Sequence, residues 1–152
     1  MATYSLTVET TSNATAGGTG TAAAIQMLMA ASTEAVLVGV MIKQQYTAAG
    51  ENSGRWVIDR ISAVTTGSSL VPLKMEDTSA ASAITDTAKT ISTTVAATNT
   101  AQDLAVVDLT DGWNDLRHLG IRSGVAKGFA LRRATAPTGA RVVVATMIWS
   151  EV

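Results

Sequence analysis

The sequence predicts an all-β fold in which a single domain forms a β-sandwich. The first observation is a series of short segments with strand character, separated by turn residues along the 152-residue chain. The second is the composition: hydrophobic residues make up 47% but aromatic residues only 4%, and Ala, Val, Thr and Ser dominate. Small and β-branched side chains favour pleated sheets. The length suits one domain with a sizeable core.

The N-terminal part begins with a half-buried strand. Tyr4, Leu6 and Val8 alternate with polar residues, which gives the period of two that a strand requires. Residues 11–21 are rich in Thr, Ser, Gly and Asn and predict a loop. Residues 22–31 fit either a strand or a helix, because Ala, Gln, Met and Leu are good helix formers. We therefore divide the chain into an N-terminal strand and loop, 1–21, and a sandwich domain, 22–152.

The middle of the chain predicts two further strands and one edge segment. Residues 35–42 are apolar on both faces, as expected for a central strand covered on each side. Residues 55–64 also read as a strand. Pro72 has no N–H to donate to a ladder, so residues 70–73 should form an edge or a loop.

The second half of the chain combines a long polar stretch with regularly spaced strands. Residues 76–100 are rich in Thr, Ala and Ser and predict a long, partly extended excursion across the surface. Short strands with turn residues between them are typical of a sandwich or jelly roll. The predicted strands of this half are 104–109, 116–121, 128–133 and 141–149.

Charge and residue content exclude several function classes. The net charge is −1, from 11 basic and 12 acidic residues without a basic stripe, so neither nucleic acid nor a membrane surface is an expected partner. The charged fraction is only 15%, which favours a surface largely covered by neighbouring subunits, although a simple Ala/Thr-rich composition would explain it too. Without cysteines, a signal peptide or a membrane-length apolar run, we expect a soluble protein.

The sequence offers one weak candidate for chemistry. Asp111, Asp115 and His118 are spaced so that they would share one face of a helix, where they could hold a divalent metal. The surrounding Gly-Trp-Asn-Asp-Leu sequence predicts a turn instead, and off a helix the spacing has no meaning. The glycine-rich residues 17–20 lack the lysine of a phosphate-binding loop. We therefore expect no catalytic residue, no metal and no cofactor, and a protein that is not an enzyme.

The order of segments is similar to that of small virion proteins of tailed bacteriophages. A strand runs through a Thr-Gly turn into a Pro-x-Lys-x-acid segment in residues 60–77, and an Ala/Thr-rich stretch follows at 83–90. Near the end come Gly-Phe-Ala-Leu-Arg at 128–132, a Pro-Thr-Gly turn at 137–139 and a final strand at 142–149. In this order the chain resembles capsid decoration (cement) proteins. The resemblance implies a jelly-roll-like sandwich, a homotrimer bound to the major capsid protein, and a place on the virion exterior after assembly in the host cytoplasm.

For such a protein the residues of interest are those that contact a neighbour. Tyr4, Leu6 and Val8 are candidates for an arm that adds a strand to another subunit, unless their strand pairs within its own sandwich. Arg132 is a candidate for an ion pair with a neighbouring chain, and a solvated arginine is the alternative. Trp149 is a candidate interface anchor, whereas a lone tryptophan in a strand more often packs in the core.

A second function would also suit a β-sandwich of this size. A receptor- or glycan-binding module of a phage fibre or tail would display an exposed aromatic cluster on one face. Trp56, Trp113 and Trp149 are far apart in the sequence and could converge there. Their positions in the fold therefore separate the two hypotheses.

Overall fold

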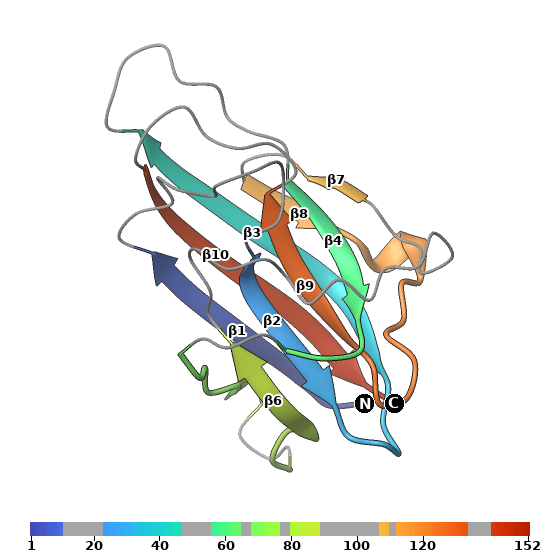
Figure 1. Ribbon diagram of the computed structural model, residues 1–152. Coiled ribbons are helices and arrows are strands. Elements are labelled where there is room, and N and C mark those ends of the chain that lie inside the picture. Colours follow the sequence, from blue (N-terminus) through green and yellow to red (C-terminus); the bar gives the residue numbers. More distant parts are fainter. Residues whose placement is uncertain are drawn as a thin grey trace.

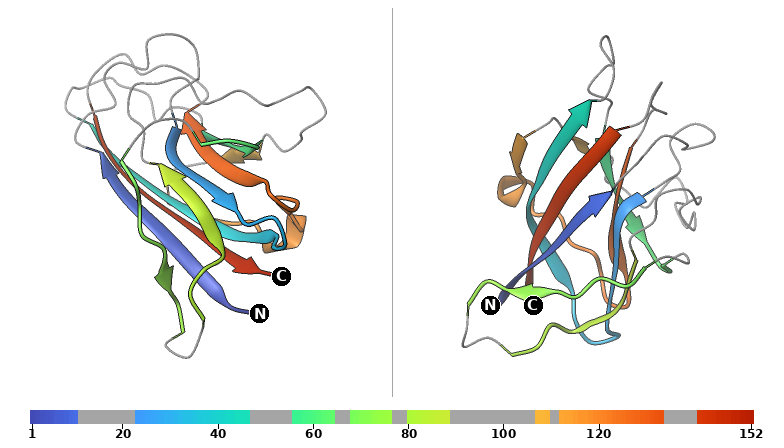
Figure 2. Two further views of the ribbon diagram at one scale, coloured as in Figure 1. Left: turned by 60° about the horizontal axis from the view of Figure 1, so that its bottom comes forward. Right: turned by 90° about the vertical axis from the view of Figure 1, so that its left-hand side faces the viewer.

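Two five-stranded antiparallel sheets pack face to face in the computed structural model of the chain (Figure 1). The structure describes residues 1–10, 23–46, 56–64, 68–76, 80–88, 107–109, 112–133 and 141–152. Figure 2 shows the two layers from the side, and both chain termini lie at the same end of the sandwich. The predicted all-β sandwich is confirmed.

Successive strands mostly alternate between the two sheets. The first sheet has the order β5-β1-β10-β3-β8 and the second has the order β6-β2-β9-β4-β7. The strands are β1 Thr3–Thr10, β2 Ala23–Met29, β3 Ala35–Tyr46, β4 Trp56–Ile61, β5 Leu73–Lys74, β6 Ile84–Ala88, β7 Val107–Leu109, β8 Gly112–Asp115, β9 Gly128–Arg133 and β10 Arg141–Glu151. A single turn of 3-10 helix, η1, covers Arg117–Leu119.

The core lies between the sheets and follows the period of two in each strand. In β1 the alternate residues Tyr4, Leu6 and Val8 point inward and are buried. The Tyr4 ring stacks on the indole of Trp149 in β10, with ring centroids 5.9 Å apart. Neighbouring strands supply the other large core side chains, which are Ile25, Met27, Met29, Leu37, Ile42, Trp56, Ile58, Phe129, Leu131 and Met147.

The outer face of the second sheet is also buried. Ile61 and Ala130 form a small apolar cluster separate from the main core, and Val64 packs against it. Asp59, which is paired in register with Ala130, is buried on the same face and forms an ion pair with Arg132. The chain itself therefore covers both faces of this sheet.

Three segments whose structure was uncertain from the sequence are described by the structure. Residues 22–31, left open between helix and strand, contain strand β2. Residues 70–73 run into the two-residue edge strand β5, directly after Pro72, as predicted. The polar stretch 76–100 was predicted to be a partly extended excursion; it contains β6, which pairs with β2, and residues 77–79 and 89–100 of it lie outside the described residues.

The prediction of a strand at 116–121 is wrong. Leu116 precedes η1, and Gly120 after it has a left-handed backbone (φ 59°). Such a backbone ends the turn and cannot continue as a strand. The strand of this region is β8, which ends at Asp115, directly before Leu116. Residues 11–22, 47–55, 65–67, 77–79, 89–106, 110–111 and 134–140 lie outside the described residues, and so do the predictions for the loop at 11–21 and most of the strand at 104–109. No helix in the described part of the chain is long and apolar enough to cross a membrane.

Candidate functional site

The side chains expected at a partner interface are mostly core residues. Tyr4, Leu6, Val8 and Trp149 have exposed fractions of only 1%, 1%, 2% and 0%. The strand β1 pairs along its whole length with β10 of the same chain, so it belongs to its own sandwich and is not an arm. This corrects the interface prediction for these four residues, because burying them against the second sheet removes them from any partner.

Arg132 is also engaged within the chain. Its guanidinium donates from Nε to the Asp59 carboxylate on the covered outer face of the second sheet. The Asp59 side chain is 3% exposed and that of Arg132 is 22% exposed. The Asp59 carboxylate is almost completely shielded from water, and a buried charge is stable only beside a counter-ion. This explains why Arg132 points to Asp59 and not to a neighbouring molecule.

The outer face of the first sheet has an unusual character for a surface. Its residues form cross-strand rows because paired residues of neighbouring strands point to the same side. One row joins Thr7, Thr146, Met41 and Trp113 across β1, β10, β3 and β8. The row beside it joins Leu73, Ser5, Ile148 and Gly39 and ends at Asp115 in the edge strand. We call these two rows, Asp115 excepted, the open face.

The open face carries no charged side chain, and among the charges nearest to it are Asp115 at its edge and Glu9 and Lys43 in the next row along the strands. Solvated faces of antiparallel sheets usually alternate polar residues with the buried ones. Here the outward residues are threonine, serine and apolar side chains, and the exposed fractions of Met41, Trp113 and Leu73 are 45%, 50% and 59%. Thr7 and Thr146 hydrogen-bond to each other through their hydroxyls at 2.9 Å, which satisfies part of their polar demand within the sheet.

Trp113 is the largest side chain of the open face. It lies over Gly39, and a Cβ built on that glycine would come within 2.3 Å of the indole Cη2 atom. Only a glycine therefore allows the ring to approach the sheet backbone this closely. The indole lies close to the sheet backbone at Gly39 while Trp113 still exposes half of its surface, which is the arrangement of an interface anchor.

The candidate metal site does not assemble in the described part of the chain. Asp111 lies outside the described residues, and no three metal-binding side chains gather among the others. Asp115 instead accepts hydrogen bonds from the Arg117 side chain and from the Arg117 N–H. These bonds lower the pKa of the Asp115 carboxyl from 3.8 to about 2. His118 is exposed at η1.

The three tryptophans do not converge on one face. Trp56 and Trp149 are buried in the core, and Trp113 alone is exposed. One feature of the sequence nonetheless indicated the open face, although we had interpreted it as a sign of a strand buried on both sides. Residues 35–42 are apolar on both faces, and we predicted that both would be covered, but only one face packs on the second sheet.

No known protein family, no characterised protein and no solved structure matches this chain.

Proposed function

We propose that this protein is a non-enzymatic structural protein of a bacteriophage virion, which binds the outer surface of the capsid and stabilises the shell. The observation that carries the docking part of this proposal is the open face. Covering the exposed tryptophan and the other apolar side chains of this face with a partner lowers the free energy, by about 25 cal/mol per Å² of apolar surface removed from water. The virion context comes from the resemblance in segment order.

The open face is large enough to form the centre of a protein contact. Five strands spaced about 4.8 Å apart make the sheet about 24 Å wide, and the two rows extend about 13 Å along the strands. This area of about 300 Å² is smaller than one side of a standard protein interface, about 800 Å², so a partner would also cover the rows around it. A contact that is weak for one copy stabilises the shell strongly when many copies repeat it around a closed particle.

The strand order supports a jelly-roll architecture for this protein. When the short strands β5 and β6 are set aside, β1-β10-β3-β8 lie opposite β2-β9-β4-β7, and successive strands alternate between the sheets except for β4 and β7, which pair in the second sheet. Two interleaved Greek keys produce such an order, and jelly rolls of this kind occur in viral capsid proteins. We further propose a closed homo-oligomer, a trimer by resemblance, with the major capsid protein as the partner.

The test is co-sedimentation with purified heads of the phage that encodes the chain, after light scattering has given the mass of the free protein. Met41→Lys places a charge in the centre of the open face, where docking would remove it from water. We expect this variant to bind at least about tenfold more weakly than the wild type. Val125→Lys is the matched control, because Val125 is similarly exposed but lies in the loop before β9.

A stable trimer that co-sediments with heads, with loss of binding in Met41→Lys alone, supports the proposal. A monomer that ignores the heads refutes it. Equal binding of both variants would refute the role of the open face. Saturable binding of purified host glycans that Trp113→Ala abolishes would instead identify a receptor-binding module, since aromatic rings commonly form the contact surface of such sites.

A further inference from the structure

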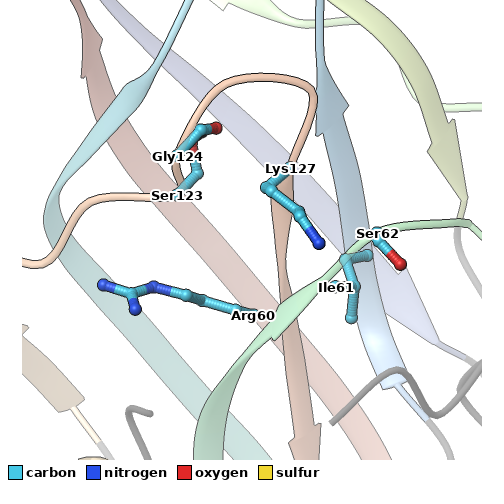
Figure 3. Close-up of a pocket in the computed structure, with 6 residues that line it drawn as sticks. All are labelled: Arg60, Ile61, Ser62, Ser123, Gly124 and Lys127. Carbon is cyan, nitrogen blue, oxygen red and sulfur yellow. Dashed lines mark hydrogen bonds between the residues drawn. The ribbon is translucent and has the colours of Figure 1, made fainter. Parts of the chain in front are cut away.

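A pocket of about 230 Å³ lies at the end of the sandwich that holds the chain termini, away from the open face. It is bounded by the end of β4 and by the loop that precedes β9. Its lining residues are Arg60, Ile61, Ser62, Ser123, Gly124 and Lys127 (Figure 3). Both charged residues of the lining are cations.

The two cations have no acidic partner among the described residues. Three carboxylates of the described residues form ion pairs with other cations: Asp115 with Arg117, Glu34 with Arg122 and Asp59 with Arg132. Arg60 is half-buried and uses its Nε to donate to the Arg122 carbonyl oxygen at 2.7 Å. This bond fixes the guanidinium and leaves its two terminal nitrogens with their N–H groups for another acceptor.

The loop that forms the other wall is held in place by its backbone. Ser123 N–H donates to the Ala35 carbonyl at 2.9 Å, and the Ser123 hydroxyl accepts from Ala35 N–H at 3.0 Å. Ala126 N–H donates to the Ala30 carbonyl at 3.3 Å. Ala126 also has a positive φ of 53°, a conformation that costs free energy in a residue other than glycine. The pocket wall is therefore preorganised.

The two charged groups approach the pocket from different sides. Figure 3 shows Arg60 extending from β4 under Ser123, while the ammonium group of Lys127 lies toward Ile61 and Ser62. Because the two charged ends extend in different directions, an anion with two charged groups can engage both of them. Arg binds a carboxylate through two parallel hydrogen bonds, and Lys binds as a point charge.

We propose that this pocket binds a small organic dianion whose two oxyanion groups are separated by a short aliphatic chain, a dicarboxylate in the simplest case. One carboxylate pairs with Arg60 and the other with Lys127, and the short aliphatic chain spans the pocket between them. This inference concerns the isolated protein and does not rest on the proposed function.

The experiment is an NMR titration of the backbone amides with glutarate, acetate and inorganic phosphate at constant ionic strength. We expect saturable shifts at Gly124 and Lys127, and glutarate binding at least about tenfold tighter than acetate, because the second carboxylate binds as a tethered group. Lys127→Gln should weaken glutarate binding to about the level of acetate and leave acetate binding at Arg60 largely unchanged. Lys43→Gln removes a lysine from the first sheet and should change neither affinity.

Three results would overturn the inference. Glutarate and acetate could bind equally well, or phosphate could bind as tightly as glutarate, and either result would show a site for one oxyanion. Shifts that Lys43→Gln reduces as much as Lys127→Gln does would reveal non-specific screening. Lys127 is exposed, so its variant should fold, and this variant decides the question even if Arg60→Gln does not fold.

Discussion

Replacing Gly39 by alanine tests whether Trp113 owes its position to the missing side chain beneath it. The new Cβ would lie 2.3 Å from the indole Cη2, 2.5 Å from Cζ2 and 2.8 Å from the Asn114 carbonyl oxygen. Ordinary contacts of a Cβ begin at 3.4 Å, so the ring must retreat by at least about 1 Å and β8 must shift with it. The open face should change its shape while the sandwich stays folded.

The cost follows from the surface that the ring buries. Trp113 exposes half of its surface, so about 100 Å² of a side chain of this size is in contact with the sheet. At about 25 cal/mol per Å², losing all of that contact would lower the free energy of unfolding by about 2.5 kcal/mol. Alanine also reduces the conformational entropy of the unfolded chain, which raises the free energy of unfolding by about 0.5 kcal/mol or more. We expect a net loss of about 1 to 2 kcal/mol.

Urea unfolding of a double-mutant cycle measures this coupling. In the Trp113→Ala background, Gly39→Ala should cost less by at least about 1 kcal/mol, because only the Asn114 carbonyl remains close. Iodide quenching of fluorescence gives a second readout, since Trp56 and Trp149 are buried and Trp113 is the accessible indole. Equal costs of Gly39→Ala in both backgrounds would refute the reasoning and leave backbone strain in β3 as the cause.

Two further predictions concern the ion pairs. In Arg117→Gln the pKa of Asp115 should rise from about 2 toward 3.8. Folding lowers this pKa, so the stabilisation is present above about pH 4 and is lost as the pH falls toward 2; the variant should flatten the pH dependence of unfolding in that window, as NMR and urea titrations would show. Asp59→Asn should lower the free energy of unfolding by about 2 to 4 kcal/mol, because it removes the buried carboxylate that pairs with the partly buried Arg132 guanidinium. Asp59→Asn with Arg132→Met should recover at least half of that loss, and no recovery would contradict the pairing.

The elements that could be predicted are those whose own residues determine them. The long strands β1, β3, β9 and β10 follow from alternation or from runs of β-branched residues. Strand β8 could not be found in this way, because Gly-Trp-Asn-Asp has the composition of a turn, and its strand conformation comes from pairing with β3. The same limit explains the mistaken strand at 116–121, where a Leu119 N–H to Leu116 carbonyl bond closes a helical turn instead.

The interface could be predicted only in part, because a sequence does not specify which apolar face the chain itself will cover. In β3 the inward residues Leu37, Val40 and Ile42 and the outward residues Val36, Val38 and Met41 are equally apolar. Low charge and doubly apolar strands indicated that some surface would be covered. Identifying that surface required knowing which face of the first sheet packs against the second sheet. With that packing known, the candidate contact residues are Met41 and Trp113 and not Tyr4 and Trp149.

The charges on the outer face of the first sheet surround the open face and do not lie within it. Glu9 and Lys43 are in register with Val144 in the next row along β1, β10 and β3, and Asp115 ends the second row in the edge strand β8. Between them Met41, Trp113 and Leu73 remain exposed, although exposed apolar faces promote association. A partner that covers the open face therefore buries apolar side chains without taking an unpaired charge out of water, while the charged side chains stay at the rim of the contact.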